Sequence, residues 1–149
     1  MKTKAYIRDQ LIGTWQLLSW QYTNMQGEIV DYFGEHPSGI LMYDLHGNMN
    51  AQLTRAGRQS FQSPAINGGT AEETFAAFHS YIAYFGTYSE QVPGEVVHHV
   101  KGSLFPNWVS RNELRYATIE EDVLTLNTPP VPVSGGTIVF TLRWKKVRH

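Results

Sequence analysis

Residues 13–23 read GTWQLLSWQYT and predict a long β-strand that begins directly after a glycine. The run is rich in Trp, Leu and Tyr, and a Gln-Gly turn at 26–27 follows it. The same alternation of short strand and turn continues through Ile29 to Phe33, Ile40 to Leu45 and Asn48 to Arg55. The first third of the chain is therefore predicted to form strands joined by short turns.

The second half of the chain repeats this pattern after position 86. Turns at Pro93-Gly94 and Glu121-Asp122 separate further runs of strand-forming residues. The predicted strands are Thr87 to Val92, Glu95 to Leu104, Arg111 to Glu120, Val123 to Asn127 and Thr137 to Val147. About nine short strands with short connections indicate a β-sandwich or a closed barrel.

Two helices interrupt the strands. Thr70 and Glu73 have the spacing of a capping box, which predicts a helix over Ala71 to Phe85, ended by Gly86. Its apolar positions follow helical spacing at Phe75, Phe78, Ile82 and Phe85. A second, short helix is expected at the N-terminus, over Thr3 to Leu11.

Composition limits the function classes. The 149 residues match one domain, 1–149, and the 17% charged share argues against a disordered chain. A net charge of −1 gives no broad attraction to nucleic acid or acidic membranes, so neither is expected as a partner. The absence of cysteine excludes disulfides and thiolate metal sites. No signal-peptide pattern or membrane-length apolar run is present, and a cytoplasmic protein is expected.

Gly13-Thr14-Trp15 at the start of the first strand resembles the G-x-W signature of lipocalins and related calycins. In that superfamily the tryptophan closes the barrel floor, and a basic residue of the last strand packs over it. The resemblance assigns that packing to Arg143, beside Trp144. A cation stacked on an indole contributes about 0.5–2 kcal/mol.

Further motifs extend the resemblance over almost the whole chain, to the lipocalin-like domain family of bacteria and fungi. They are residues 39–43, 47–53, 97–100, 103–109 and 122–126, and the final Leu142-x-Trp144. The resemblance implies an all-β, antiparallel up-and-down barrel of about eight to ten strands with a central cavity. It implies no agreed reaction and no catalytic residues. The chain departs from secreted lipocalins in its lack of cysteine and export signal and in its mid-chain helix.

Side-chain alternation predicts which residues face that cavity. In the strand from Glu95, the apolar set Val96, His98, Val100, Gly102 and Leu104 is expected inside, with His99 outside. Ser19 and Gln21 are expected to follow Trp15 to the inner face. The candidate ligand-binding residues are Trp15, Leu17, Ser19, Met42, Met49, Ala51, Leu53, Tyr88, Val100, Asn107, Trp108, Arg115 and Tyr116.

His98 is the candidate catalytic residue, because an imidazole in a partly apolar cavity can act as a general acid or base. The alternative is a buried histidine whose ring is satisfied by a hydroxyl or backbone group. A tyrosine or carboxylate would orient it, and Asp44 and Glu90 are candidate partners. His98 and His99 point to opposite faces and cannot share a metal ion, so no metal site and no cofactor are expected.

Arg115 is a candidate anchor for a carboxylate or phenolate, and otherwise a solvated strand residue. The sequence favours a protein that binds a small hydrophobic or aromatic molecule in the barrel. The alternative is a cyclase or isomerase of polyketide or terpenoid secondary metabolism that uses His98 in the same cavity. A purely structural role is a third reading, and homo-oligomerisation stays open.

Overall fold

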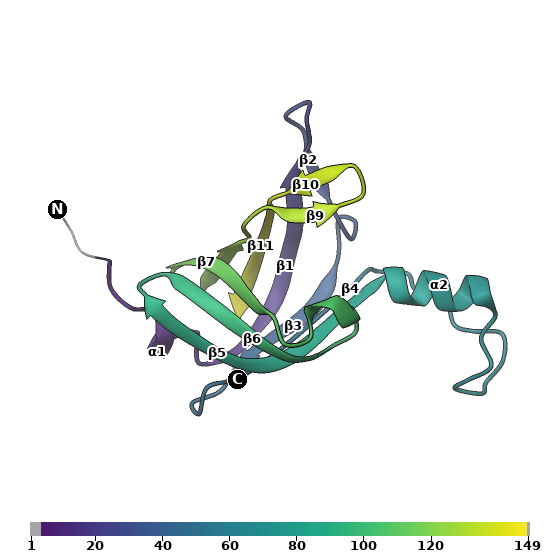
Figure 1. Ribbon diagram of the computed structural model, residues 1–149, viewed down its shortest axis with the longest axis horizontal. Helices are drawn as coiled ribbons and strands as arrows, with labels where there is room; N and C mark the ends of the chain where they lie inside the picture. The colour runs from purple at the N-terminus through teal and green to yellow at the C-terminus, as the bar shows by residue number, and fades with distance from the viewer. Residues whose placement is uncertain (1–3, 149) are drawn as a thin grey trace.

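The computed structural model describes residues 4–148 and contains an eight-stranded antiparallel barrel. Each barrel strand pairs with the next, and the last pairs with β1, which closes the sheet (Figure 1). In this order the strands are β1 (Gly13–Thr23), β3 (Ser38–Tyr43), β4 (Asn48–Thr54), β5 (Tyr81–Val92), β6 (Glu95–Ser103), β7 (Asn112–Glu120), β8 (Val123–Asn127) and β11 (Phe140–Lys146). The all-β lipocalin-like fold predicted from the sequence is confirmed.

Three short strands of the described residues lie outside the closed sheet. β2 (Ile29–Asp31) pairs with the far end of β1, and β9 (Val131–Val133) forms a hairpin with β10 (Gly136–Ile138). In the view of Figure 1, both β2 and this hairpin appear toward the top of the barrel. The expected last strand, Thr137 to Val147, is therefore divided between β10 and β11, with Val139 outside both.

The helices are shorter than predicted. α2 (Ala71–His79) has the expected capping box between Thr70 and Glu73, but the strand β5 already begins at Tyr81. β5 pairs with β4 from Thr54–Tyr81 to Asn48–Thr87. This pairing places in a strand the residues from Tyr81 onward that their spacing had predicted to be helical. α2 projects from the barrel (Figure 1), and none of its residues is buried. The N-terminal helix is reduced to α1 (Arg8–Leu11), and position 3 of the expected helix lies outside the described residues.

A β-bulge in β1 changes which of its side chains face inward. The register against β11 shifts between Leu17 and Ser19, so Trp15 and Leu17 are buried and the next buried residue is Trp20. Leu18 is 43% exposed. The predicted inward sequence of Ser19 and Gln21 is wrong, because regular alternation does not continue through a bulge.

One end of the barrel is filled by side chains. Trp15 is 1% exposed, and its Nε1 donates to the carbonyl oxygen of Leu11 at 2.8 Å. The Lys146 Nζ lies 4.6 Å from the Trp15 ring centroid and donates to the carbonyl oxygens of Ile12 and Gln10. The predicted stacking of Arg143 is wrong: Trp15 pairs with Lys146 in register, and Arg143, next to inward-facing Trp144, is exposed.

Candidate binding cavity

The other end of the barrel holds a cavity of about 530 Å³. Small-molecule sites in proteins span roughly 300–1,000 Å³, so the volume suits one compact organic molecule. All eight barrel strands contribute lining residues, among them Trp20, Leu41, Ala51, Tyr84, His98, Arg115, Leu126 and Trp144. The rim adds residues from α2, from the 3-10 turn η1 (Pro106–Trp108) and from the proline-rich segment 129–133.

Aromatic rings form much of the wall. Trp20 lies with its ring centroid 4.6 Å from that of Phe33, 4.7 Å from Tyr32 and 5.5 Å from Phe140. On another part of the lining, Trp108 of η1 meets Tyr84 edge-on at 5.7 Å. Rings packed in this way offer faces and edges to a flat apolar ligand.

His98 is fully buried between two tyrosines. Its Nε2 lies 2.7 Å from the Tyr43 hydroxyl, and its Nδ1 lies 2.8 Å from the Tyr84 hydroxyl. Tyr84 and His98 line the cavity, whereas Tyr43 lies behind them in the core. His98 therefore faces inward as predicted, and a ligand that reaches this wall meets the Tyr84 hydroxyl with the imidazole hydrogen-bonded to it.

Burial keeps these three groups neutral. It lowers the pKa of His98 well below the ordinary histidine value, and the Arg115 and His99 side chains lower it further. Burial also raises the pKa of both Tyr43 and Tyr84, although Arg115 opposes the rise in each. A neutral imidazole has one donor and one acceptor nitrogen, so the two hydroxyls satisfy it completely.

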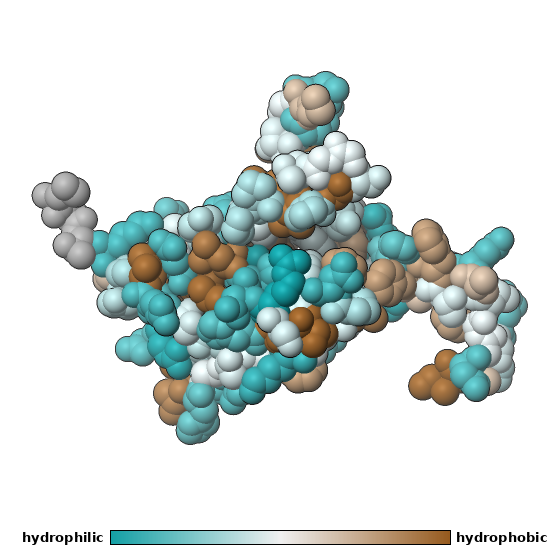
Figure 2. Space-filling view, viewed as in Figure 1, coloured by the Kyte–Doolittle hydropathy of each residue, from teal (hydrophilic) through white to brown (hydrophobic). Residues whose placement is uncertain are grey.

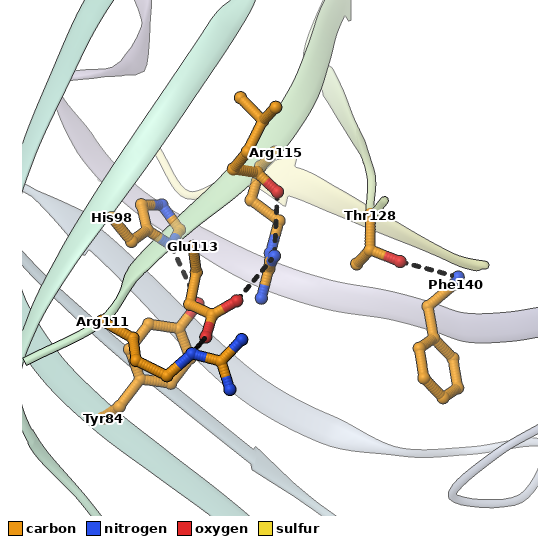
Figure 3. A network of polar contacts seen from close by, with 8 residues as sticks. Tyr84, His98, Arg111, Glu113, Arg115, Thr128 and Phe140 are labelled. Atoms are coloured by element: carbon orange, nitrogen blue, oxygen red, sulfur yellow. Dashed lines mark hydrogen bonds and ion pairs between the residues drawn. The ribbon is translucent and has the colours of Figure 1, made fainter. Parts of the chain in front are cut away.

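A charged group lies next to this array on β7 (Figure 3). The Glu113 Oε2 is 3.8 Å from Arg115 Nη1, and its Oε1 is 3.5 Å from the Arg111 Nε. The Oε1 atom is buried and has no hydrogen bond within the described chain. Arg115 donates from Nη1 to the carbonyl oxygen of Leu114 at 2.9 Å. The carboxylate and guanidinium are thus close enough to attract each other, yet they are not hydrogen-bonded together.

The structure divides the predicted site residues into three groups. The cavity lining includes Ala51, Leu53, His98, Asn107, Trp108 and Arg115. The packed core, outside the lining, includes Trp15, Leu17, Met49, Tyr88 and Val100. They face inward as alternation predicts, but other side chains fill the space around them.

The third group lies outside the cavity. Met42 is 42% exposed because β3 turns Leu41 and Tyr43 inward, and Tyr116 is 46% exposed because Arg115 and Ala117 take the inner face of β7. The bulge in β1 removes Ser19 from the lining. Leu104, also predicted inside, follows the end of β6 and is 39% exposed.

The carboxylates suggested as partners of His98 are used elsewhere. Asp44 is exposed and accepts hydrogen bonds from the backbone N–H groups of His46 and Asn48 in the β3–β4 turn. Glu90 accepts from the backbone N–H groups of Ile7, Arg8 and Gly94, and so fixes the N-terminal segment. The pairing of His98 with either residue is wrong, whereas a tyrosine partner is correct.

Sequence reasoning missed Tyr43, Tyr84, Glu113 and Trp20. A signal for Glu113 was present, because it lies two positions from Arg115 in one strand and must share its face. Tyr84 was assigned to a helix, which hid its alternation with Ile82 and Tyr88. Within residues 4–148, no cluster of three or more His, Cys, Asp or Glu could hold a metal ion. The same residues include no helix of the length and apolarity that a membrane crossing requires.

Comparison with known proteins agrees with this architecture. The family model of the lipocalin-like domain matches residues 12–147. The 4'-hydroxy-3'-methoxypropiophenone carrier protein of Aspergillus oryzae is 32% identical over 107 residues, covering 66% of this chain and 96% of that protein. A barrel of this family and a relative named as a carrier both support the binding of a small molecule. On the extent of the family match, the chain belongs to the lipocalin-like domain family.

Proposed function

We propose that the protein binds and carries a small, largely aromatic molecule in the open end of its barrel. The observation that carries this proposal is the cavity of about 530 Å³ with aromatic rings on its wall. Burial of a flat apolar ligand against such rings contributes about 25 cal/mol for each Å² removed from water. Polar groups on one wall then fix its orientation.

The relative supports the aromatic character of the ligand. Its name assigns it an aryl ketone that carries a hydroxyl and a methoxy group. A molecule of that class matches a cavity whose lining includes both aromatic side chains and polar groups. Trp20, Phe33 and Phe140 are among the former, and Tyr84 and Arg115 are among the latter. A cytoplasmic location stays a prediction.

Native mass spectrometry of the purified protein tests the proposal without assuming a ligand. We expect a bound small molecule that is released on denaturation. Titration with 4'-hydroxy-3'-methoxypropiophenone then measures affinity, with quenching of tryptophan fluorescence as the signal because Trp20 and Trp144 line the cavity.

A matched pair of variants places the binding site. Ala51→Phe fills the cavity and should abolish binding, because Ala51 lies in its wall. Asn50→Phe adds the same ring at the neighbouring position, which faces away from the barrel interior, and should leave binding unchanged. Equal affinity in both variants would show that the cavity is not the site.

The arrangement around His98 favours one version of the enzymatic alternative. Both ring nitrogens are hydrogen-bonded to tyrosines, so a proton exchanged with the ligand would pass through the Tyr84 hydroxyl. A cyclase or isomerase reaction in this cavity stays a prediction. Its test is mass analysis of the bound molecule before and after incubation, in the native protein and in Tyr84→Phe.

A further inference from the structure

The polar part of the cavity offers a ligand both a cationic hydrogen-bond donor and an anionic hydrogen-bond acceptor. Arg115 and Glu113 have side chains that are only 9% and 14% exposed, in a wall that is otherwise largely aromatic and aliphatic. A guanidinium has five N–H donors, and a carboxylate is only an acceptor when ionised. One of the Arg115 donors is used by the Leu114 carbonyl, and the guanidinium also lies near the Tyr84 hydroxyl, where it opposes the rise in pKa that burial causes.

The separation of these two charges allows one further atom, lying to one side of the pair, to contact both. The Arg115 Nη1 and Glu113 Oε2 are 3.8 Å apart, which exceeds hydrogen-bond distance (Figure 3). An oxygen placed about 2.8 Å from both can accept from Arg115 and donate to Glu113. Arg115 has donors beyond the one used by the Leu114 carbonyl, and Glu113 accepts no hydrogen bond from it. Because a largely buried charge is stabilised by each further hydrogen bond, a group that bonds to both is favoured at this position.

Few chemical groups meet both requirements. A carbonyl or ether oxygen accepts from Arg115 but has no proton for Glu113, and an ammonium group donates but is repelled by Arg115. A carboxylate would accept from Arg115 and be repelled by Glu113. A hydroxyl donates and accepts through a single oxygen.

We propose that the ligand is a phenol whose hydroxyl hydrogen-bonds to both Glu113 and Arg115 while its ring packs on the aromatic wall. The aromatic lining favours a phenol over an aliphatic alcohol, because the ring can pack against it. A phenol is also the stronger hydrogen-bond donor to a carboxylate. This inference rests on the proposed function and specifies the ligand of the same cavity.

A series of three ligands tests the hydroxyl directly. Dissociation constants are measured for 4'-hydroxypropiophenone, its 4'-methoxy ether and unsubstituted propiophenone, at a pH at which the free phenol is protonated. We expect the phenol to bind about 10- to 100-fold more tightly than the other two, because it alone makes a hydrogen bond to a charged acceptor.

Variants of Glu113 and Arg115 test whether these two charges cause the preference for the phenol. Glu113→Gln should reduce the phenol-to-ether ratio toward one, and Arg115→Met should weaken both ligands because both oxygens accept from the guanidinium. Glu120→Gln makes the same chemical change at an exposed position of β7 and should retain the full ratio. Circular dichroism of each variant confirms that the barrel has formed.

The outcomes separate this inference from the proposed function. Similar affinities for all three ligands would leave carrier function intact and overturn the phenol site. Tighter binding of 4-ethylbenzoate than of the phenol would also overturn it, in favour of a carboxylate site. Failure of every compound to bind, together with an empty protein by native mass spectrometry, would overturn the carrier proposal itself.

Discussion

The two ends of the barrel contain the same kinds of residues but differ in whether their buried polar atoms are hydrogen-bonded. At the filled end, the Trp15 indole and the Lys146 ammonium both donate to backbone carbonyls. At the open end, the buried Nε1 atoms of Trp20 and Trp144 and the Glu113 Oε1 have no hydrogen bond within the described residues. Most buried polar atoms in proteins are paired. Tryptophan and a cation occur at both ends, so residue type does not distinguish them. The ends differ in whether the buried polar atoms have hydrogen-bond partners in the described chain: those of the filled end do, and several at the open end do not.

Replacing each of the two tryptophans with alanine should give the largest difference in effect between the two ends. Trp15→Ala removes a ring that is packed on all sides, so we expect a loss of about 3–5 kcal/mol in the free energy of unfolding. Trp20→Ala should cost less, because its ring borders a cavity, and should weaken ligand binding instead. Urea unfolding and fluorescence titration measure the two effects. Equal destabilisation by both substitutions would contradict the division into a structural end and a binding end.

The tyrosines on either side of His98 provide a finer comparison. Tyr43→Phe and Tyr84→Phe each leave one buried ring nitrogen without its partner, which costs about 1–3 kcal/mol. Only Tyr84 lines the cavity, so only its variant should also change the dissociation constant of the ligand. A change in affinity on Tyr43→Phe alone would show that the cavity extends behind His98.

The buried imidazole also predicts how stability depends on pH. Since the pKa of His98 is lower in the folded protein than in the unfolded chain, the unfolded state binds the additional proton below about pH 6.5. The contribution of the neutral imidazole to the free energy of unfolding is therefore fully present above that pH. It is lost as the pH decreases, by at most about 1.4 kcal/mol per pH unit. His98→Gln should reduce the slope measured by urea unfolding between pH 7 and 5, whereas His46→Gln in an exposed turn is the control.

The smallest expected effect concerns the cation at the filled end. Lys146→Met removes a cation–π contact and donors to two carbonyls, and we expect a loss of about 0.5–2 kcal/mol. Arg143→Met, at an exposed position three residues earlier in β11, should change thermal unfolding very little. The opposite order would restore the role that the lipocalin resemblance gave to Arg143.

The sequence predicted the fold and part of the cavity for identifiable reasons. In β4, Met49, Ala51 and Leu53 alternate with polar residues, and all three are buried as expected. In β3, residues 40–43 are apolar or aromatic on both faces, so alternation could not choose Tyr43 over Met42.

The remaining errors come from interactions between distant parts of the chain. The spacing of Phe78, Ile82 and Phe85 satisfies a helix locally, but cross-strand pairing with β4 decides the structure from Tyr81 onward. The register of β11 against β1 gives Lys146 the place expected for Arg143. The hydrogen bonds of His98 likewise join β3, β5 and β6, and no local spacing indicates such a meeting.

The irregularity in β1 lets one strand serve both ends of the barrel. Trp15 and Trp20 are an odd number of residues apart, and an uninterrupted strand would send their rings to opposite sides of the sheet. The extra residue near Leu18 is therefore what admits the second indole to the interior. Deleting one residue there would expel that ring into solvent while the floor stays closed. The length of this segment therefore matters to the barrel interior as much as the identity of the two tryptophans.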